Sequence, residues 1–151
     1  MENKYMRQAL NLALQCEAEG EVPVGAVIVK DGEVIAEGSN RRETGKNALY
    51  HAEIEAINNA CKTLGGWRLD GCDLYVTLEP CPMCAGAIIN ARIKTVYFGA
   101  YDSKAGSFGS VEDFSRFRYP YTPEIIGGVM EKECEKVLTD FFKKLRKKEE
   151  L

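Results

Sequence analysis

Apolar residues recur along the chain with two different periods, which predict helices and strands in alternation. Helical spacing predicts a first helix that stops at Gly20 and a closing helix over residues 129–148. The Asp31-Gly32 pair predicts a hairpin turn. Apolar runs predict five strands, near residues 22–29, 33–38, 73–78, 95–99 and 124–126. We expect five apolar side chains on the inner face of the closing helix: Val137, Leu138, Phe141, Phe142 and Leu145.

Two more helices complete the expected α/β architecture. One is predicted from about His51 to about Thr63, and another begins near Pro82, because proline suits a first helical turn. A strand, a helix and a strand in that order imply a parallel crossover. Residues 100–123 have no clear pattern, and such long segments are often functional. We therefore expect a mixed sheet with helices on both faces, in a single domain over residues 1–151.

Charge and composition narrow the class of protein. The net charge of -3 argues against a protein that coats nucleic acid by bulk electrostatics. The basic run at residues 143–148 has two interpretations, a solvated helix end near the C-terminal dipole or a local basic patch. No signal peptide and no bilayer-spanning apolar run are recognisable, so we expect a cytoplasmic protein with no membrane partner.

The cysteines favour metal binding over disulfides. In a cytoplasmic setting, metal binding or burial as plain thiols is more common than a disulfide. Only Cys81 and Cys84 are close enough in sequence to form a ligand pair. We interpret Cys16, Cys61 and Cys134 as small buried hydrophobes.

The elements His51-Ala52-Glu53 and Pro80-Cys81-Pro82-Met83-Cys84 predict a zinc site. Cys81 and Cys84 are three residues apart at a predicted helix start, which places both side chains on one side and favours their thiolates. His51 supplies a third ligand, and catalytic zinc usually has three protein ligands plus water. A His-x-Glu before a Pro-Cys-x-x-Cys is the signature of zinc deaminases, in which the Glu transfers protons. We therefore expect one Zn²⁺ per chain and Glu53 as the catalytic acid and base.

Two geometric points qualify this prediction. Residues two apart on a regular helix point about 200° away from each other, so His51 and Glu53 converge only if they lie at the first turn. Cys72 is a candidate fourth ligand. Structural zinc sites are closed by four ligands, so Cys72 decides between an enzyme and a binding module with a structural zinc.

The chain resembles the bacterial tRNA adenosine deaminases, within the cytidine deaminase superfamily. The matching stretches cover almost the whole chain and lie at residues 21–27, 38–41, 51–54, 74–87, 98–100, 102–106 and 140–142. The resemblance implies a three-layer α/β/α cytidine deaminase-like fold with a five-stranded mixed sheet. It also implies a homodimer and, as substrate, the wobble adenosine of a tRNA anticodon, which becomes inosine.

The resemblance further implies a set of substrate contacts. Asn40 matches an asparagine that hydrogen-bonds the substrate, and Val22 matches a residue that lines the pocket. Ala52 and Pro80 match backbone groups around the base and the leaving ammonia. Asp102 matches an acidic residue near the nucleotide sugar. Each has a plainer interpretation, which is a turn for Asn40, core packing for Val22 and a solvated loop acid for Asp102.

The chain departs from the family pattern in two places that border the RNA-binding face. It has Asn47-Ala48-Leu49-Tyr50 where the family commonly has Asp-Pro-Thr-Ala, and Pro120-Tyr121 where the family often has Asn-His. The chemistry is therefore better determined than the substrate. A free nucleobase or nucleoside of the guanine, adenosine or cytosine type stays an alternative to tRNA.

Overall fold

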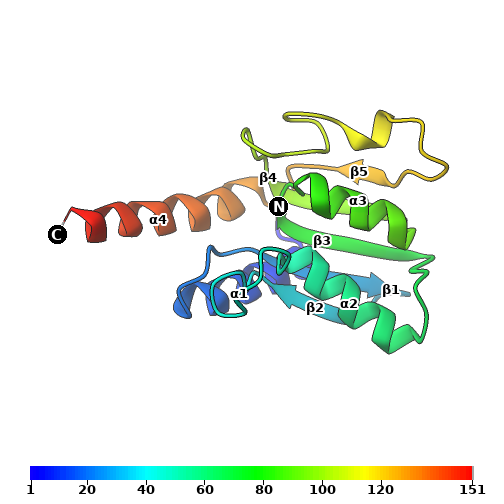
Figure 1. Ribbon diagram of the computed structural model, residues 1–151, viewed down its shortest axis with the longest axis horizontal. Coiled ribbons are helices and arrows are strands. Elements are labelled where there is room, and N and C mark those ends of the chain that lie inside the picture. Colours follow the sequence, from blue (N-terminus) through cyan, green and yellow to red (C-terminus); the bar gives the residue numbers. More distant parts are fainter. Residues whose placement is uncertain (151) are drawn as a thin grey trace.

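The computed structural model describes residues 1–150 and consists of a five-stranded sheet between two pairs of helices (Figure 1). Along the chain the elements are α1 (Lys4–Ala18), β1 (Gly25–Lys30), β2 (Glu33–Ser39), α2 (Ala52–Leu64), β3 (Cys72–Leu78), α3 (Pro82–Ala91), β4 (Thr95–Ala100), the 3₁₀ helix η1 (Phe114–Arg116), β5 (Glu124–Ile126) and α4 (Glu131–Glu149).

The sheet is mixed, as the sequence predicts, with the strand order β2-β1-β3-β4-β5. β1 pairs antiparallel with β2 and with β3, whereas β4 is parallel to both β3 and β5. α3 makes the crossover between the parallel strands β3 and β4. β3 is therefore the middle strand, and the segment that follows it leads directly to the predicted cysteine ligands.

The helices cover both faces of the sheet because the central strands are apolar on both sides. Ala26 and Ile28 of β1 belong to the core under α2 and α3, whereas Val27 and Val29 belong to the core under α1 and α4. Side chains alternate between the faces of a strand, so a strand buried on both faces has a continuous apolar run. In Figure 1, α2 and α3 lie side by side across one face of the sheet.

Helix boundaries follow local signals in the sequence. Asn3 caps α1, since its side chain accepts hydrogen bonds from the backbone amides of Tyr5 and Met6. α2 ends at Gly65, which has a left-handed backbone, and α3 has Pro82 in its first turn. The first strand begins at Gly25 rather than near residue 22.

The prediction for the inner face of the closing helix is wrong at two positions. Phe142 is 42% exposed and Leu145 is 41% exposed. The reason is visible in Figure 1, where α4 runs past the end of the sheet, so that its last turns have no sheet face to cover them. Amphipathic spacing predicts which side chains share a helix face. It does not predict how much of that face the rest of the protein covers.

A close approach between β2 and α2 positions the first turn of α2. A Cβ atom at Gly38 would overlap backbone atoms of Ala52 and Ala56. The absence of a side chain at Gly38 therefore lets the helix lie directly on the strand. Ala52, Ala56 and Ala60 are all fully buried and present small side chains to the sheet.

None of the helices within residues 1–150 combines the length and the apolar character that a membrane crossing requires.

Candidate metal centre

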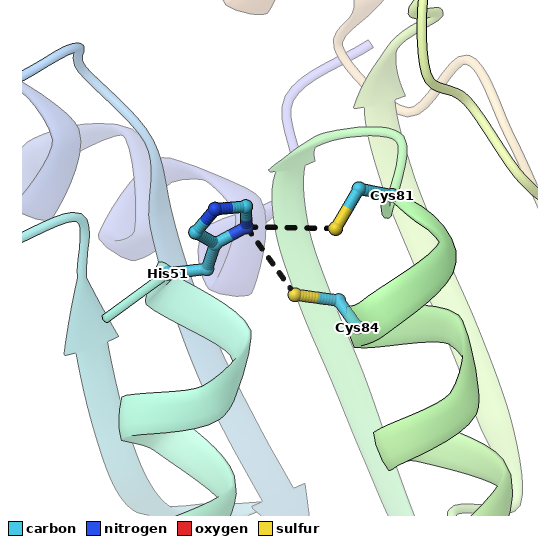
Figure 2. Close-up of side chains that lie close together, drawn as sticks. All are labelled: His51, Cys81 and Cys84. Atoms are coloured by element: carbon cyan, nitrogen blue, oxygen red, sulfur yellow. Dashed lines mark hydrogen bonds between the residues drawn. The ribbon is translucent and has the colours of Figure 1, made fainter. Parts of the chain in front are cut away.

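Two helix starts bring the predicted zinc ligands together at the end of β3. His51 is the N-cap residue of α2, and Cys81 is the N-cap residue of α3. Cys84 lies in the first turn of α3 and is fully buried. Figure 2 shows the imidazole of His51 facing both sulfur atoms across the space between the two helices.

The spacing of the three donor atoms fits a tetrahedral zinc ion. His51 Nδ1 lies 3.6 Å from Cys81 Sγ and 3.5 Å from Cys84 Sγ. Zinc binds sulfur at about 2.3 Å and nitrogen at about 2.0–2.1 Å, so tetrahedral angles require a nitrogen-to-sulfur separation of about 3.6 Å. All three donor atoms lie within 4.8 Å of one another. The donor set, one imidazole and two thiols, is also the one that zinc prefers.

The metal-binding group in the described part of the chain has three members: His51, Cys81 and Cys84. Cys72 does not join it. Cys72 is the first residue of β3, and Cys81 and Cys84 come after the last residue of the same strand. At about 3.3 Å per residue, the length of β3 separates Cys72 from the site by roughly 20 Å. A closed structural zinc site with Cys72 as fourth ligand is therefore not formed.

Glu53 converges with His51 because the backbone is extended at His51. The N-cap has φ -79° and ψ 155°, so His51 is not part of the helical turn that carries Glu53. The helical arithmetic that would point the two side chains apart does not apply at this position. Glu53 is 4% exposed and lines the same pocket as His51. Burial raises the pKa of the Glu53 carboxyl to about 7.

Three acidic groups, Cys81, Cys84 and Glu53, share this small space and shift one another's pKa. Hydrogen bonds from Cys84 and His51 lower the pKa of the Cys81 thiol to about 4, against the effect of burial. The hydrogen bond with Cys81, burial and the nearby Glu53 raise the pKa of Cys84 well above its ordinary value. The hydrogen bond to Cys81 also raises the pKa of His51, although burial opposes it. A divalent cation would offset the negative charges of two thiolates beside a carboxylate. Without a cation, these three groups do not all ionise together.

A pocket of about 300 Å³ opens beside the donor atoms. This volume is at the small end of ligand pockets, which range over about 300–1,000 Å³, and it suits a single base. Four of the five residues predicted to contact substrate line it, namely Val22, Asn40, Ala52 and Asp102. Pro80 is buried and is not among the lining residues, although its neighbours Glu79 and Cys81 are.

The predicted substrate contacts already have partners within the protein. The amide nitrogen of Asn40 donates to the Val22 carbonyl at 3.1 Å, and its oxygen accepts from the Arg42 amide at 3.4 Å. The Asp102 carboxylate accepts from the amides of Lys104 and Ala105. Both residues therefore shape turns in the walls of the pocket, and their contacts with substrate stay a prediction.

Sequence reasoning missed six residues that line the pocket: Val24, Arg42, Leu78, Glu79, Ala105 and Phe142. Phe142 comes from α4, far along the chain, and only the folded structure brings it to the pocket. Glu79 is 2% exposed, and its place between a buried strand and the Pro80-Cys81 pair was a local signal that was available.

Comparison with known proteins supports the assignment of the chain to the zinc-binding deaminases. The family profile described as "Cytidine and deoxycytidylate deaminase zinc-binding region" matches residues 1–100. A tRNA-specific adenosine deaminase from Bacillus subtilis (strain 168) is 49% identical over 145 residues, which is 95% of this chain and 90% of that protein.

Solved structures agree in fold. A structure from studies of A-to-I editing by tRNA:A34 deaminases matches with a TM-score of 0.86 and 45% identity, over 91% of this chain and 100% of that chain. A guanine deaminase from Bacillus subtilis matches with a TM-score of 0.63 and 36% identity, over 80% of this chain and 88% of that chain. The sheet, the donor set and these similarities agree: the chain belongs to the zinc-binding cytidine and deoxycytidylate deaminase family.

Proposed function

We propose that this chain is a zinc-dependent hydrolytic deaminase that converts the wobble adenosine of a tRNA anticodon to inosine. The observation that carries the proposal is a metal-binding group of three residues that shares one pocket with a buried carboxylate. Three protein ligands leave a coordination position for water, which is the arrangement of catalytic rather than structural zinc. The relative from Bacillus subtilis that carries this activity in its name aligns over 95% of the chain.

The reaction replaces the 6-amino group of adenine by oxygen from water and releases ammonia. Bound zinc would supply a Lewis acid that lowers the pKa of water from about 15.7 to about 7. Glu53 then moves the protons. It accepts one proton from water and delivers it to the ring nitrogen N1. It then takes the second proton from the hydroxyl group formed on C6 and passes it to the departing amine, so that a carbonyl remains at C6 and ammonia leaves. Burial raises the pKa of the Glu53 carboxyl above its ordinary value, which favours its acceptance of a proton during the reaction.

The walls of the pocket provide the substrate contacts in this proposal. Asn40 and the backbone of Ala52 contact the base, Val22 supplies an apolar wall, and Asp102 lies near the sugar. The Pro80 carbonyl would lie near the leaving ammonia, and it already accepts a hydrogen bond from the Ser107 amide at 2.9 Å. A carbonyl oxygen has two lone pairs, so this bond leaves it able to accept a second donor.

α4 supports an RNA substrate rather than a free base. Phe142 lines the pocket, and the basic residues of the last two turns follow it on the part of α4 that extends away from the sheet (Figure 1). Arg146 is one helical turn beyond Phe142, so the two side chains share a face. An exposed aromatic ring and an adjacent cation are suited to a flipped base and its phosphates. A tRNA substrate implies that the protein acts in the cytoplasm.

Deamination of a free purine is the second candidate. The guanine deaminase from Bacillus subtilis shares 36% identity and the same fold over 80% of the chain. Its similarity, together with the departures from the family pattern at residues 47–50 and 120–121, favours this candidate. The two candidates share the zinc chemistry and differ in whether phosphates contribute to binding.

We also propose that the protein acts as a homodimer that packs through α3. This helix has no charged residue from Pro82 to Ala91. Met83, Gly86 and Ala87 are partly exposed on it, and small apolar residues let two backbones approach closely.

Replacing Glu53 by Gln tests the proposed proton transfer. Glu53→Gln keeps the shape of the side chain but does not transfer protons, so we expect kcat to fall by about 10²–10⁴-fold. Zinc content, measured by mass spectrometry of the metal, should stay at one ion per chain because Glu53 is not in the metal-binding group. Glu55→Gln, on the same helix and paired with Arg41, is the matched control and should keep wild-type turnover. Full turnover in Glu53→Gln would contradict the mechanism.

A comparison of substrates tests the proposed use of tRNA. We expect ammonia release from an anticodon stem-loop with adenosine at the wobble position and none from free adenosine or guanine. The rate should fall steeply with salt. In a plot of log rate against log salt concentration, each phosphate contact should contribute about −0.7 to the slope. Arg146→Ala should raise KM for the stem-loop, whereas Lys132→Ala, at the other end of α4, should not. Salt-independent deamination of guanine or adenosine, with no activity on the stem-loop, would favour the second candidate.

Sedimentation equilibrium tests the proposed dimer. We expect twice the chain mass of 16.8 kDa for the wild type and a shift toward the single-chain mass for Ala87→Arg. A wild-type protein that sediments as a monomer at micromolar concentration would contradict the proposal.

A further inference from the structure

Glu79 is a buried carboxylate that the proposed chemistry does not use. It lies between the end of β3 and the zinc-binding turn, two residues before Cys81, and it is 2% exposed. Its Oε1 accepts hydrogen bonds from the Asp102 amide at 3.0 Å and from the Ser110 hydroxyl. Its Oε2 accepts from the amides of Phe108 and Ser110, each at 3.1 Å. Four donors from one loop therefore converge on a single side chain.

The loop over residues 102–110 is closely fitted to this carboxylate. A Cβ atom at Gly106 would overlap the carboxylate of Glu79, so the backbone of the loop lies directly against it. The adjoining backbone strengthens the connection, because the Ser107 amide donates to the Pro80 carbonyl and the Glu79 amide donates to the Ala100 carbonyl, both at 2.9 Å. The position of the loop is therefore determined by the same turn that carries Cys81.

The same loop forms one wall of the pocket. Asp102 and Ala105 both line the cavity beside His51 and Glu53. The backbone amide of Asp102 donates to Glu79, so the carboxylate holds a residue that lines the pocket. Substrate that enters the pocket meets a surface whose shape depends on Glu79.

We propose that Glu79 is a positioning residue that holds the 102–110 loop as a wall of the substrate pocket and thereby sets substrate affinity. It acts through the backbone of Asp102, Phe108 and Ser110. The choice of assay substrate rests on the proposed function, whereas the position of the loop does not.

Glutamine at position 79 distinguishes the effect of side-chain volume from the effect of side-chain charge. Glu79→Gln keeps the volume of the side chain, but its amide group has one oxygen and one NH₂. If the NH₂ replaces Oε2, it faces the amides of Phe108 and Ser110. If it replaces Oε1, it faces the Asp102 amide, and only the Ser110 hydroxyl is able to turn and accept. Neither orientation satisfies all four donors.

Steady-state kinetics and amide exchange test the proposal. In zinc-loaded Glu79→Gln we expect KM for the stem-loop to rise at least about tenfold, which is the loss of one charge-assisted hydrogen bond, and kcat to change by less than about threefold. Ser110→Ala removes only the hydroxyl donor and should raise KM by a smaller factor. Ser115→Ala is the matched control, because its hydroxyl donates to Asp113 instead, and it should keep the wild-type KM.

Hydrogen exchange is the readout that does not depend on activity. In Glu79→Gln the NH₂ group replaces one of the two oxygens, so either the amides of Phe108 and Ser110 or the amide of Asp102 lose a hydrogen bond. The amides that lose it should exchange at least about tenfold faster than in the wild type. Kinetics are measured well below the melting temperature of the variant, so that a general loss of stability does not change KM.

The outcomes separate the two proposals. A wild-type protein that is inactive on the stem-loop would contradict the proposed function, and the exchange experiment would still decide the role of Glu79. Unchanged exchange at these three amides, or a lowered kcat with an unchanged KM in folded, zinc-loaded Glu79→Gln, would overturn the positioning role.

Discussion

The site depends on the meeting of two helix starts at one end of the central strand. α2 begins just after His51 and α3 just after Cys81, and neither N-cap uses its side chain to cap its own helix. Both side chains are therefore directed to each other rather than to backbone amides. The exposed amides and the helix dipoles at these two ends favour negative charge, which stabilises thiolates and the nearby carboxylate. Contacts elsewhere in the fold hold the two helix starts in position. One of them is the close contact of β2 with α2 at Gly38.

Two buried carboxylates beside this site have different roles because their surroundings differ. Glu53 is placed among sulfur atoms and an imidazole, where burial raises its pKa to about 7 and suits it to proton transfer. Glu79 is surrounded by three backbone amides and a hydroxyl, which suits it to holding a loop. In our proposals, the same residue type thus supplies chemistry on one side of the pocket and shape on the other.

Local signals in the sequence were enough to predict the order of the α-helices and strands, but not the 3₁₀ helix η1. Gly65 and Pro82 marked the end of α2 and the start of α3, and the apolar run at residues 22–29 indicated a buried strand, which the structure places at Gly25–Lys30. The zinc ligands were recognisable because His51-Ala52-Glu53 and Pro80-Cys81-Pro82-Met83-Cys84 carry their chemistry in short, continuous stretches. The convergence of His51 and Glu53 required an extended backbone at His51, which the structure has.

Features that depend on distant contacts were not predictable. The loss of Phe142 and Leu145 from the core follows from the length of α4 relative to the sheet, which no helical pattern encodes. The position of Glu79 before the Pro80-Cys81 pair was a local signal, but its hydrogen-bond donors come from residues 102–110, which only the fold brings to it. Cys72 differs from these, because the strand predicted near residues 73–78 already lay between it and Cys81, and the structure confirms this strand as β3.

A crystal structure of the zinc-loaded protein tests the central claim most directly. We expect one zinc ion bound by His51 Nδ1, Cys81 Sγ and Cys84 Sγ, with a water molecule as the fourth ligand at hydrogen-bond distance from the Glu53 carboxylate. A fourth ligand from a protein side chain, or a Glu53 carboxylate directed away from the ion, would contradict the account.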